Sequence, residues 1–180
     1  MFSPVVHALA KQLISEFRSA GLRLVTAESH TAGLVAAAPA DVSGASNVLE
    51  GSAVTHSYAL KTALLQVPEQ VLNDEGAVNS VVADQMARGA LQLALKADMA
   101  LAVTGEAGPE SSGKEPIGTV FLAVAVRLPG SHPPRVTRHQ FGGGRLEVRI
   151  ATVEAALRAA LEMLPYLTGV AGQQSDVLRT

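Results

Sequence analysis

The chain has 180 residues, of which 48% are hydrophobic and 17% charged, and its formal net charge is −2. This length and apolar content predict one folded domain with a sizeable core and exclude a largely disordered chain. The absence of cysteine excludes disulfides, thiolate metal sites and a cysteine nucleophile.

The composition also narrows the classes of partner. No run of lysine and arginine marks a nucleic-acid surface, and aromatic residues make up only 3% of the chain. No apolar run reaches the length of a membrane span, and the first residues do not resemble a signal peptide. We therefore expect a cytoplasmic protein that binds neither nucleic acid nor a membrane.

The first elements are a helix, a strand and a second helix. Ser3 and Pro4 are typical of a helix start, apolar residues then recur at helical spacing, and Gly21 is typical of a helix end. Residues 22–28 are expected to form a buried strand. A helix of small residues then begins near Thr31.

Strands and helices continue to alternate beyond residue 46. We expect strands at 47–57, 97–104, 117–126 and 134–141, and helices at 58–65, 81–96 and 142–164. Residues 67–78 are expected to form a loop with one further turn, and Asn79 or Ser80 could cap the helix that follows. The uninterrupted apolar run of 117–126 is typical of a strand inside a sheet, whereas the alternation of 134–141 is typical of an edge strand.

This order predicts an α/β fold, a layered α/β/α sandwich with a mostly parallel, partly mixed sheet. We expect a single domain over residues 1–167 and a mobile tail over 168–180, which has no packing pattern. Ligands of such sheets bind at the carboxyl ends of the strands. Three loops are expected there: ESHTAG at 28–33, THSYALK at 55–61 and TGEAGP at 104–109.

Residues 108–115, GPESSGKE, nearly match the phosphate-binding loop G-x-x-x-x-G-K-[ST]. However, Glu115 occupies the position of the magnesium-binding Ser or Thr, and Pro116 and an apolar strand follow where a helix is needed. We therefore interpret residues 110–115 as a solvated hairpin tip. Phosphoryl transfer remains an alternative that requires magnesium-dependent ATP binding through Lys114.

Four motifs occur in a characteristic order: TAESHTAG at 26–33, TGEAGP at 104–109, PIGTV at 116–120 and FGGGR at 141–145. Together they resemble the C-terminal domain of the competence/damage-inducible CinA family, over roughly residues 5–165. The resemblance implies an amidohydrolase that deamidates nicotinamide mononucleotide (NMN) to nicotinic acid mononucleotide and ammonia. It also implies a pyridine nucleotide as the small-molecule partner, no cofactor, and a homo-oligomer.

The resemblance further implies catalytic roles. The serine of the family motif E-S-C-T-G-G corresponds to Ser29, the expected nucleophile, and the lysine of Y-S-N-x-x-K corresponds to Lys61, the expected base. A lysine base must be neutral, so its pKa must fall by about 2–3 units through burial or a nearby positive charge. His56 replaces the family tyrosine and is expected to act as acid or base, although Tyr58 could assist instead.

The other expected site residues lie in the same motifs. They are Glu28, His30, Thr31, Gly33, Thr104, Gly105, Ala107, Gly108, Gly118, Thr119 and Arg145. Arg145, at the start of a helix after three glycines, is the candidate phosphate ligand, with Arg149 one turn further on.

Several alternatives stay open. Glu28 could be an acid of the site or a helix-capping carboxylate, and Ser29 with Thr31 could simply cap the following helix. No carboxylate or third histidine stands at ligand spacing from His30 and His56, so we predict no metal site. The replacement of the family tyrosine also motivates an alternative function: a family member that binds a nucleotide-like ligand, as a sensor or interaction module, without turning it over.

Overall fold

Five strands form one mixed sheet in the computed structural model, which describes residues 2–111, 114–128 and 132–169. The strands are β1 (Leu24–Glu28), β2 (Leu49–Val54), β3 (Met99–Gly105), β4 (Thr119–Val126) and β5 (Arg135–Gln140). Their order across the sheet is β2-β1-β3-β4-β5. β1 is parallel to β2 and β3, whereas β4 is antiparallel to β3 and β5. The predicted mostly parallel, partly mixed sheet is therefore confirmed.

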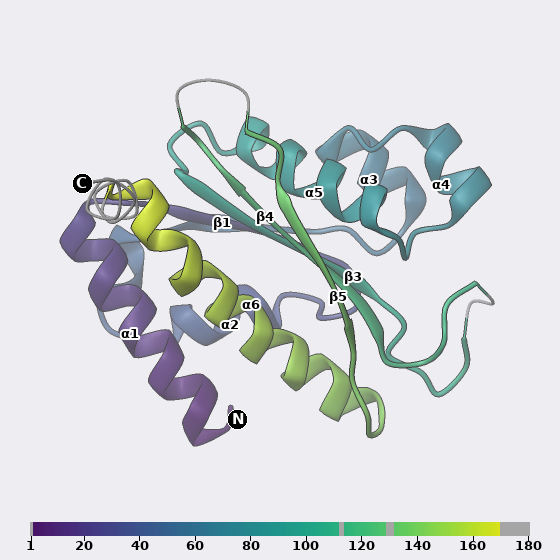
Figure 1. Ribbon diagram of the computed structural model, residues 1–180, viewed down its shortest axis with the longest axis horizontal. Helices are drawn as coiled ribbons and strands as arrows, with labels where there is room; N and C mark the ends of the chain where they lie inside the picture. Colours follow the sequence, from purple (N-terminus) through teal and green to yellow (C-terminus); the bar gives the residue numbers. More distant parts are fainter. Residues whose placement is uncertain (1, 112–113, 129–131, 170–180) are drawn as a thin grey trace, which may run out of the picture.

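Helices cover both faces of this sheet and complete three layers (Figure 1). One face carries α1 (Pro4–Ala20), α2 (Leu34–Ala40) and α6 (Arg145–Leu167). The other face carries α3 (Tyr58–Leu65), α4 (Glu69–Glu75) and α5 (Ser80–Leu93). A short 3-10 helix, Ala45–Asn47, leads into β2. The α/β/α sandwich is confirmed, with β4 inside the sheet and β5 at its edge as expected.

The alternation of side chains along the strands produces two cores. In β3, Met99 and Leu101 contact the α1 and α6 side, whereas Ala100 and Ala102 contact the α5 side. The same alternation continues past the ends of the parallel strands. The alternation therefore also fixes the face of the sheet to which the side chains after β1, β2 and β3 point, and with it the helices that they contact.

Local sequence signals place several helix ends correctly. The Ser3 hydroxyl accepts a hydrogen bond from the first turn of α1, and Gly21, with a φ of 68°, caps the other end of this helix. Asn79 caps α5, and its side-chain oxygen accepts a hydrogen bond of 2.8 Å from a backbone N–H. Ser80 is instead the first residue of α5.

Two elements differ from the sequence-based expectation. α2 begins at Leu34 and not near Thr31, because a turn occupies the residues after β1. In that turn Ala32 and Gly33 have φ values of 53° and 95°, which a helix does not permit. Residues 67–78 contain more structure than the expected single turn, since Glu69–Glu75 form α4.

α6 ends at Leu167, the last residue of the expected domain. Most of the expected tail, from residue 170 onward, lies outside the described residues, so its mobility stays a prediction. Within the described ranges, no helix combines the length and the apolar character that crossing a membrane requires.

Candidate active site

The carboxyl ends of β1, β2 and β3 bring the three predicted loops together. Glu28 at the end of β1 lies beside Val54 of β2 and Val103 of β3. The pairing continues for one more residue, since Ser29 N donates to Val103 O at 3.1 Å and Thr55 N donates to Glu28 O at 2.8 Å. Ser29 thus stands between the ends of the two neighbouring strands.

Lys61 reaches this point from α3, and its amine contacts the expected nucleophile. Nζ of Lys61 lies 2.9 Å from Oγ of Ser29. The same nitrogen donates hydrogen bonds to the backbone carbonyls of Thr55, at 2.6 Å, and His56, at 3.2 Å. Three oxygens therefore surround the amine.

Burial sets the protonation of this lysine. Lys61 has no exposed surface, and burial lowers its pKa from the ordinary value of 10.5 to about 8. No nearby positive charge contributes to this shift. The direction agrees with the requirement stated for a lysine base, and of the two causes considered there it is burial that acts.

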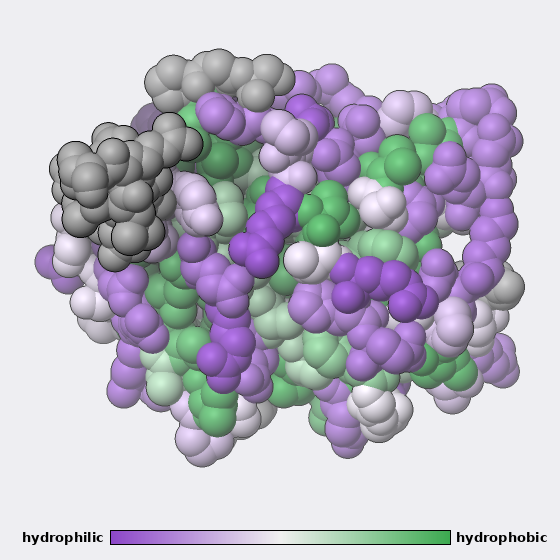
Figure 2. Space-filling view, in the orientation of Figure 1, coloured by the Kyte–Doolittle hydropathy of each residue, from purple (hydrophilic) through white to green (hydrophobic). Residues whose placement is uncertain are grey.

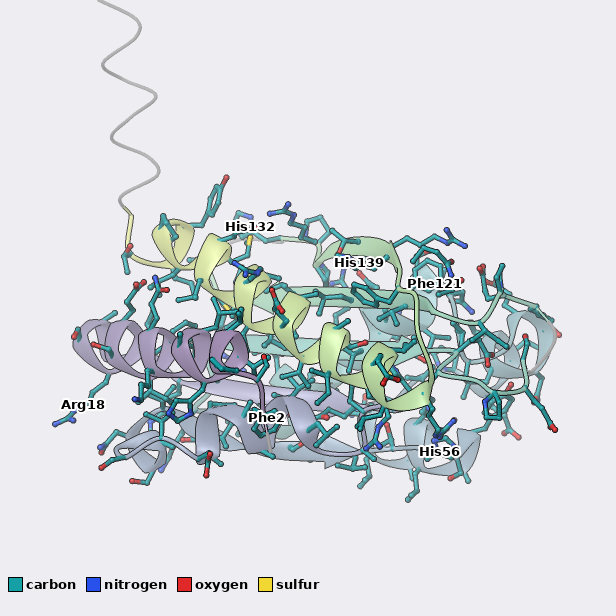
Figure 3. All side chains as sticks on the ribbon, turned by 90° about the horizontal axis from the view of Figure 1, so that it is seen from below. Phe2, Arg18, His56, Phe121, His132 and His139 are labelled. Atoms are coloured by element: carbon teal, nitrogen blue, oxygen red, sulfur yellow. The ribbon has the colours of Figure 1, made fainter. Side chains whose placement is uncertain are left out.

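The side chain of His56 does not join this contact. His56 is exposed, and Figure 3 shows it at the lower surface of the molecule, away from His132 and His139. Its backbone carbonyl is the part that contacts Lys61. Tyr58, the alternative, is also exposed, in the first turn of α3.

Glu28 binds the start of α2. Its fully buried carboxylate accepts hydrogen bonds from the hydroxyls of Thr26, Thr31 and Ser52. It also accepts hydrogen bonds from the backbone N–H groups of Gly33, Val35 and Ala36. These bonds occupy both oxygens, so the structure favours the capping alternative, and the expected substrate contact of Glu28 stays a prediction. Thr31 is likewise tied to this carboxylate.

His30 points from the same turn toward α6. It is 4% exposed, and its Nε2 lies 3.0 Å from Oγ1 of Thr152. Because that hydroxyl already donates to Val148 O at 2.8 Å, it accepts the proton of Nε2, and Nδ1 is left as a bare acceptor. Burial lowers the pKa of His30 to about 3, with a further contribution from Arg149 and Arg145. His30 is therefore neutral at physiological pH.

Two arginines at the start of α6 border the turn that holds Ser29. Nη1 of Arg145 donates to Gly108 O at 2.6 Å, and Nη2 of Arg149 donates to Thr31 O at 3.0 Å. Arg145 is exposed and Arg149 is half-buried. Both cations are close enough to His30 to lower its pKa.

The remaining expected residues line the β3–β4 connection. Thr104 Oγ1 donates to Ala77 O at 2.7 Å, and Thr119 Oγ1 donates to Gln140 Oε1 at 2.9 Å. Gly105 is required by close approach, because a Cβ there would lie 2.8 Å from Thr119 O. Gly118 has a φ of 88°, and a Cβ there would lie 2.0 Å from a backbone oxygen. Ala107 and Gly108 are buried beside them. The two threonine hydroxyls thus hold β3 and β4 to neighbouring segments, and the ligand contacts expected of these residues stay predictions.

The loop at 108–115 does not have the surroundings of a phosphate-binding loop. It leads into β4 and not into a helix. Lys114 donates to the backbone carbonyl of Asp74, and Glu115 pairs with Arg138 at 2.9 Å. Gly113 of the apparent motif lies outside the described residues. The hairpin tip therefore reaches across to the end of α4, where we had expected only solvent.

Two cavities differ in their relation to this site. One of about 510 Å³ lies between α6 and the β4–β5 pair, away from Ser29, where Figure 2 shows apolar surface. A smaller one of about 120 Å³ adjoins the site, since Ala77 lines it and accepts the hydrogen bond of Thr104. Among the described residues, no group of three or more His, Cys, Asp or Glu side chains could hold a metal ion.

Comparison with known proteins places this arrangement in a family. The family described as "CinA C-terminal domain" matches residues 6–164. The chain belongs to this family. A CinA-like protein of Geotalea daltonii is 46% identical over 142 residues, which make up 78% of this chain and 33% of the relative.

Solved CinA structures show the same fold. The competence/damage inducible protein CihA from Agrobacterium tumefaciens is 38% identical with a TM-score of 0.83, and the match covers 91% of this chain and 98% of that one. A CinA superfamily protein from Escherichia coli is 31% identical with a TM-score of 0.81, covering 91% and 94%. The chain spans about a third of the length of the curated relatives that it matches.

Some residues of this CinA domain site escaped the sequence analysis. Thr152, which fixes the tautomer of His30, lies 122 positions along the chain, and nothing in the local sequence marks it. Ala77 and the backbone carbonyl of Thr55 contribute only oxygen atoms that every residue type possesses. Such contacts follow from the fold and not from a motif.

Proposed function

We propose that this protein is an amidohydrolase that deamidates NMN to nicotinic acid mononucleotide and ammonia, with Ser29 as nucleophile and Lys61 as base. The set of three oxygens around Nζ of Lys61 supports this proposal most directly. Family membership supports the same direction.

The geometry of the amine favours proton transfer from Ser29. Carbonyl oxygens only accept hydrogen bonds, so those of Thr55 and His56 take two N–H groups of a neutral amine. The lone pair is then directed at the third neighbour, Oγ of Ser29, and can take its proton. With a pKa of about 8, roughly a tenth of Lys61 is neutral at pH 7.

The proposed reaction has two stages. Oγ of Ser29 attacks the carboxamide carbon while its proton moves to Nζ of Lys61, and the carbonyl oxygen becomes an oxyanion. Lys61 then gives that proton to the amide nitrogen, the C–N bond breaks, and ammonia leaves an acyl ester on Ser29. Water attacks this ester with Lys61 again as base, and the proton returns to Oγ as the acid is released. The backbone N–H of His30, next to the nucleophile, is the candidate donor to the oxyanion.

The substrate's phosphate would bind at the start of α6. Arg145 and Arg149 supply positive charge near residue 30, and Arg145 keeps its guanidinium partly in solvent. The exposed imidazole of His56, whose backbone carbonyl contacts Lys61, is the candidate for exchanging protons with solvent between turnovers.

The test measures ammonia and nicotinic acid mononucleotide after the purified protein is incubated with NMN and no added metal. Ser29→Ala and Lys61→Met should each abolish turnover. The exposed residues Ser43 and Lys96 provide matched controls, since Ser43→Ala and Lys96→Met should retain it. Binding of NMN without turnover in the unaltered protein would favour the alternative function of a ligand-binding module. If the protein shows no binding of NMN and no turnover, the proposal is refuted.

A further inference from the structure

Thr55 carries a hydroxyl that the proposed reaction does not use. The residue follows β2 directly and is fully buried, and its Oγ1 has no hydrogen-bond partner among the described residues. Ala27 and Ala53 are paired across β1 and β2 and lie in the core on the α3 and α5 side. Two residues further on, Ser29 and Thr55 occupy the same face.

Lys61 enters on this same face. Its Nζ lies 2.6 Å from the carbonyl oxygen of Thr55, so the amine lies against this residue. A buried hydroxyl without a partner lowers stability, and most native proteins pair such groups. Exceptions gather where function requires them. The unpartnered hydroxyl belongs to the residue whose carbonyl binds the proposed base, and it is therefore a candidate for a role in holding that base.

We propose that Thr55 is a positioning residue for Lys61, whose hydroxyl accepts a hydrogen bond from Nζ when the lysine is an ammonium, both in the resting protein and after the proton of Ser29 has moved to Nζ. This inference rests on the proposed function. The proton moves from Oγ of Ser29 to Nζ of Lys61, and Thr55 neither gains nor loses one. The bond from Nζ to His56 O, at 3.2 Å the longest of the three, is the one that gives way.

No charged side chain that the structure describes around Lys61 is placed to stabilise its ammonium, so a neutral group must do so. No ion pair involves Lys61 within the described part of the chain. The titratable groups of the elements packed around it are His30 and Glu28 on the β1 side, His56 before α3, Glu106 after β3, and Asp84 with Arg88 on α5. The carboxylate of Glu28 accepts hydrogen bonds from the first N–H groups of α2, and Asp84 pairs with Arg88 at 2.8 Å. A hydroxyl acceptor can therefore stabilise the ammonium where no carboxylate contacts it.

The kinetic test compares pH profiles of NMN deamidation. In Thr55→Val the ammonium loses an acceptor, so the acid limb of kcat/KM should move about one pH unit lower and the plateau of kcat should fall about tenfold. Thr55→Ser keeps the hydroxyl and should stay within about twofold of the unaltered protein. The melting temperature of Thr55→Val should not fall, because the change removes an unpaired polar atom.

Thr62 supplies a matched control. Its Oγ1 is also buried without a partner, and it follows Lys61 on α3. Thr62→Val should therefore keep the unaltered pH profile. The inference is overturned if Thr55→Val leaves the acid limb in place, if Thr55→Ser behaves like Thr55→Val, or if Thr62→Val produces the same shift.

A second measurement does not depend on turnover. The lysines of the chain are Lys11, Lys61, Lys96 and Lys114. NMR titration of protein with ¹³C-labelled lysine can therefore follow Lys61, assigned by its loss in Lys61→Met. Thr55→Val should lower the pKa of Lys61 by about one unit, and an unchanged titration overturns the inference. This readout still judges Thr55 if the protein proves to have no deamidase activity, so the two proposals can fail separately.

Discussion

Lys61 should make the stability of the fold depend on pH in the alkaline range. Its pKa is 10.5 when exposed and about 8 in the folded protein. Below pH 8 both states carry the proton, and the folded state bears the full penalty of a buried charge. Between pH 8 and 10.5 the folded state has lost the proton that the unfolded chain retains. Because the unfolded state then binds more protons, the free energy of unfolding rises with pH through this window.

The size of this rise follows from the two pKa values. Each unit of pKa corresponds to about 1.36 kcal/mol, so the change across the window is about 3 kcal/mol. Lys61→Met removes the titrating group but leaves every other lysine and tyrosine. The free energy of unfolding of the unaltered protein, minus that of Lys61→Met, should therefore increase by about 3 kcal/mol from about pH 7 to about pH 10.5.

Urea unfolding of both proteins at constant ionic strength measures this difference. Contributions from the other titrating groups cancel in the subtraction, and hydrogen bonds lost in Lys61→Met add a constant that does not depend on pH. Lys96→Met, at an exposed lysine, should show no such trend. A difference that stays constant between pH 7 and 10.5 would refute the assignment of a buried, weakly basic Lys61. The acid limb of kcat/KM should also lie near pH 8 if the same group is the base.

Three further outcomes follow from the turn after β1. Glu28→Gln should lower the free energy of unfolding by about 2–4 kcal/mol in urea melts, because the NH2 group of glutamine would face the N–H and O–H donors that now bind the carboxylate. A loss below about 1 kcal/mol would contradict the capping role. Ala32→Gly should raise it by about 0.5–1 kcal/mol, since Ala32 has a φ of 53° on an exposed turn, and a decrease would contradict this reasoning. His30 should make the stability of the protein sensitive to acid. Its pKa is about 3 in the folded state and 6.5 in the unfolded chain, so between these values only the unfolded chain binds the proton. Stability is therefore full above pH 6.5 and should fall by about 2 kcal/mol by about pH 5, a loss that His30→Leu should remove.

The regular elements were predictable because their signals are local. Ser3, Gly21 and Asn79 act on backbone groups within a few residues, and the apolar run of β4 needs no knowledge of its neighbours. The late start of α2 was not predictable in this way. The carboxylate of Glu28 collects N–H groups up to eight residues further on, so the chain turns before the helix begins.

The contacts of the candidate site were not predictable from the motifs. Motifs named Ser29 and Lys61, but their contact depends on the parallel pairing of β1 with β2 and on the return of α3 across the sheet. The partner of His30 comes from α6 at the other end of the chain. Burial, which sets the pKa values of Lys61 and His30, is likewise a property of the assembled layers and not of any segment.

The anchoring of Lys61 restricts where the chain can change length. The carbonyls that hold its amine belong to Thr55 and His56, only six and five positions earlier. One inserted residue in this segment would turn α3 by about 100° and carry the amine away from Ser29. Insertions between residues 55 and 61 should therefore be excluded. Within the hairpin tip at 110–115, Lys114 and Glu115 contact the rest of the molecule through their side chains, and this tip is where longer and shorter versions of the domain should differ.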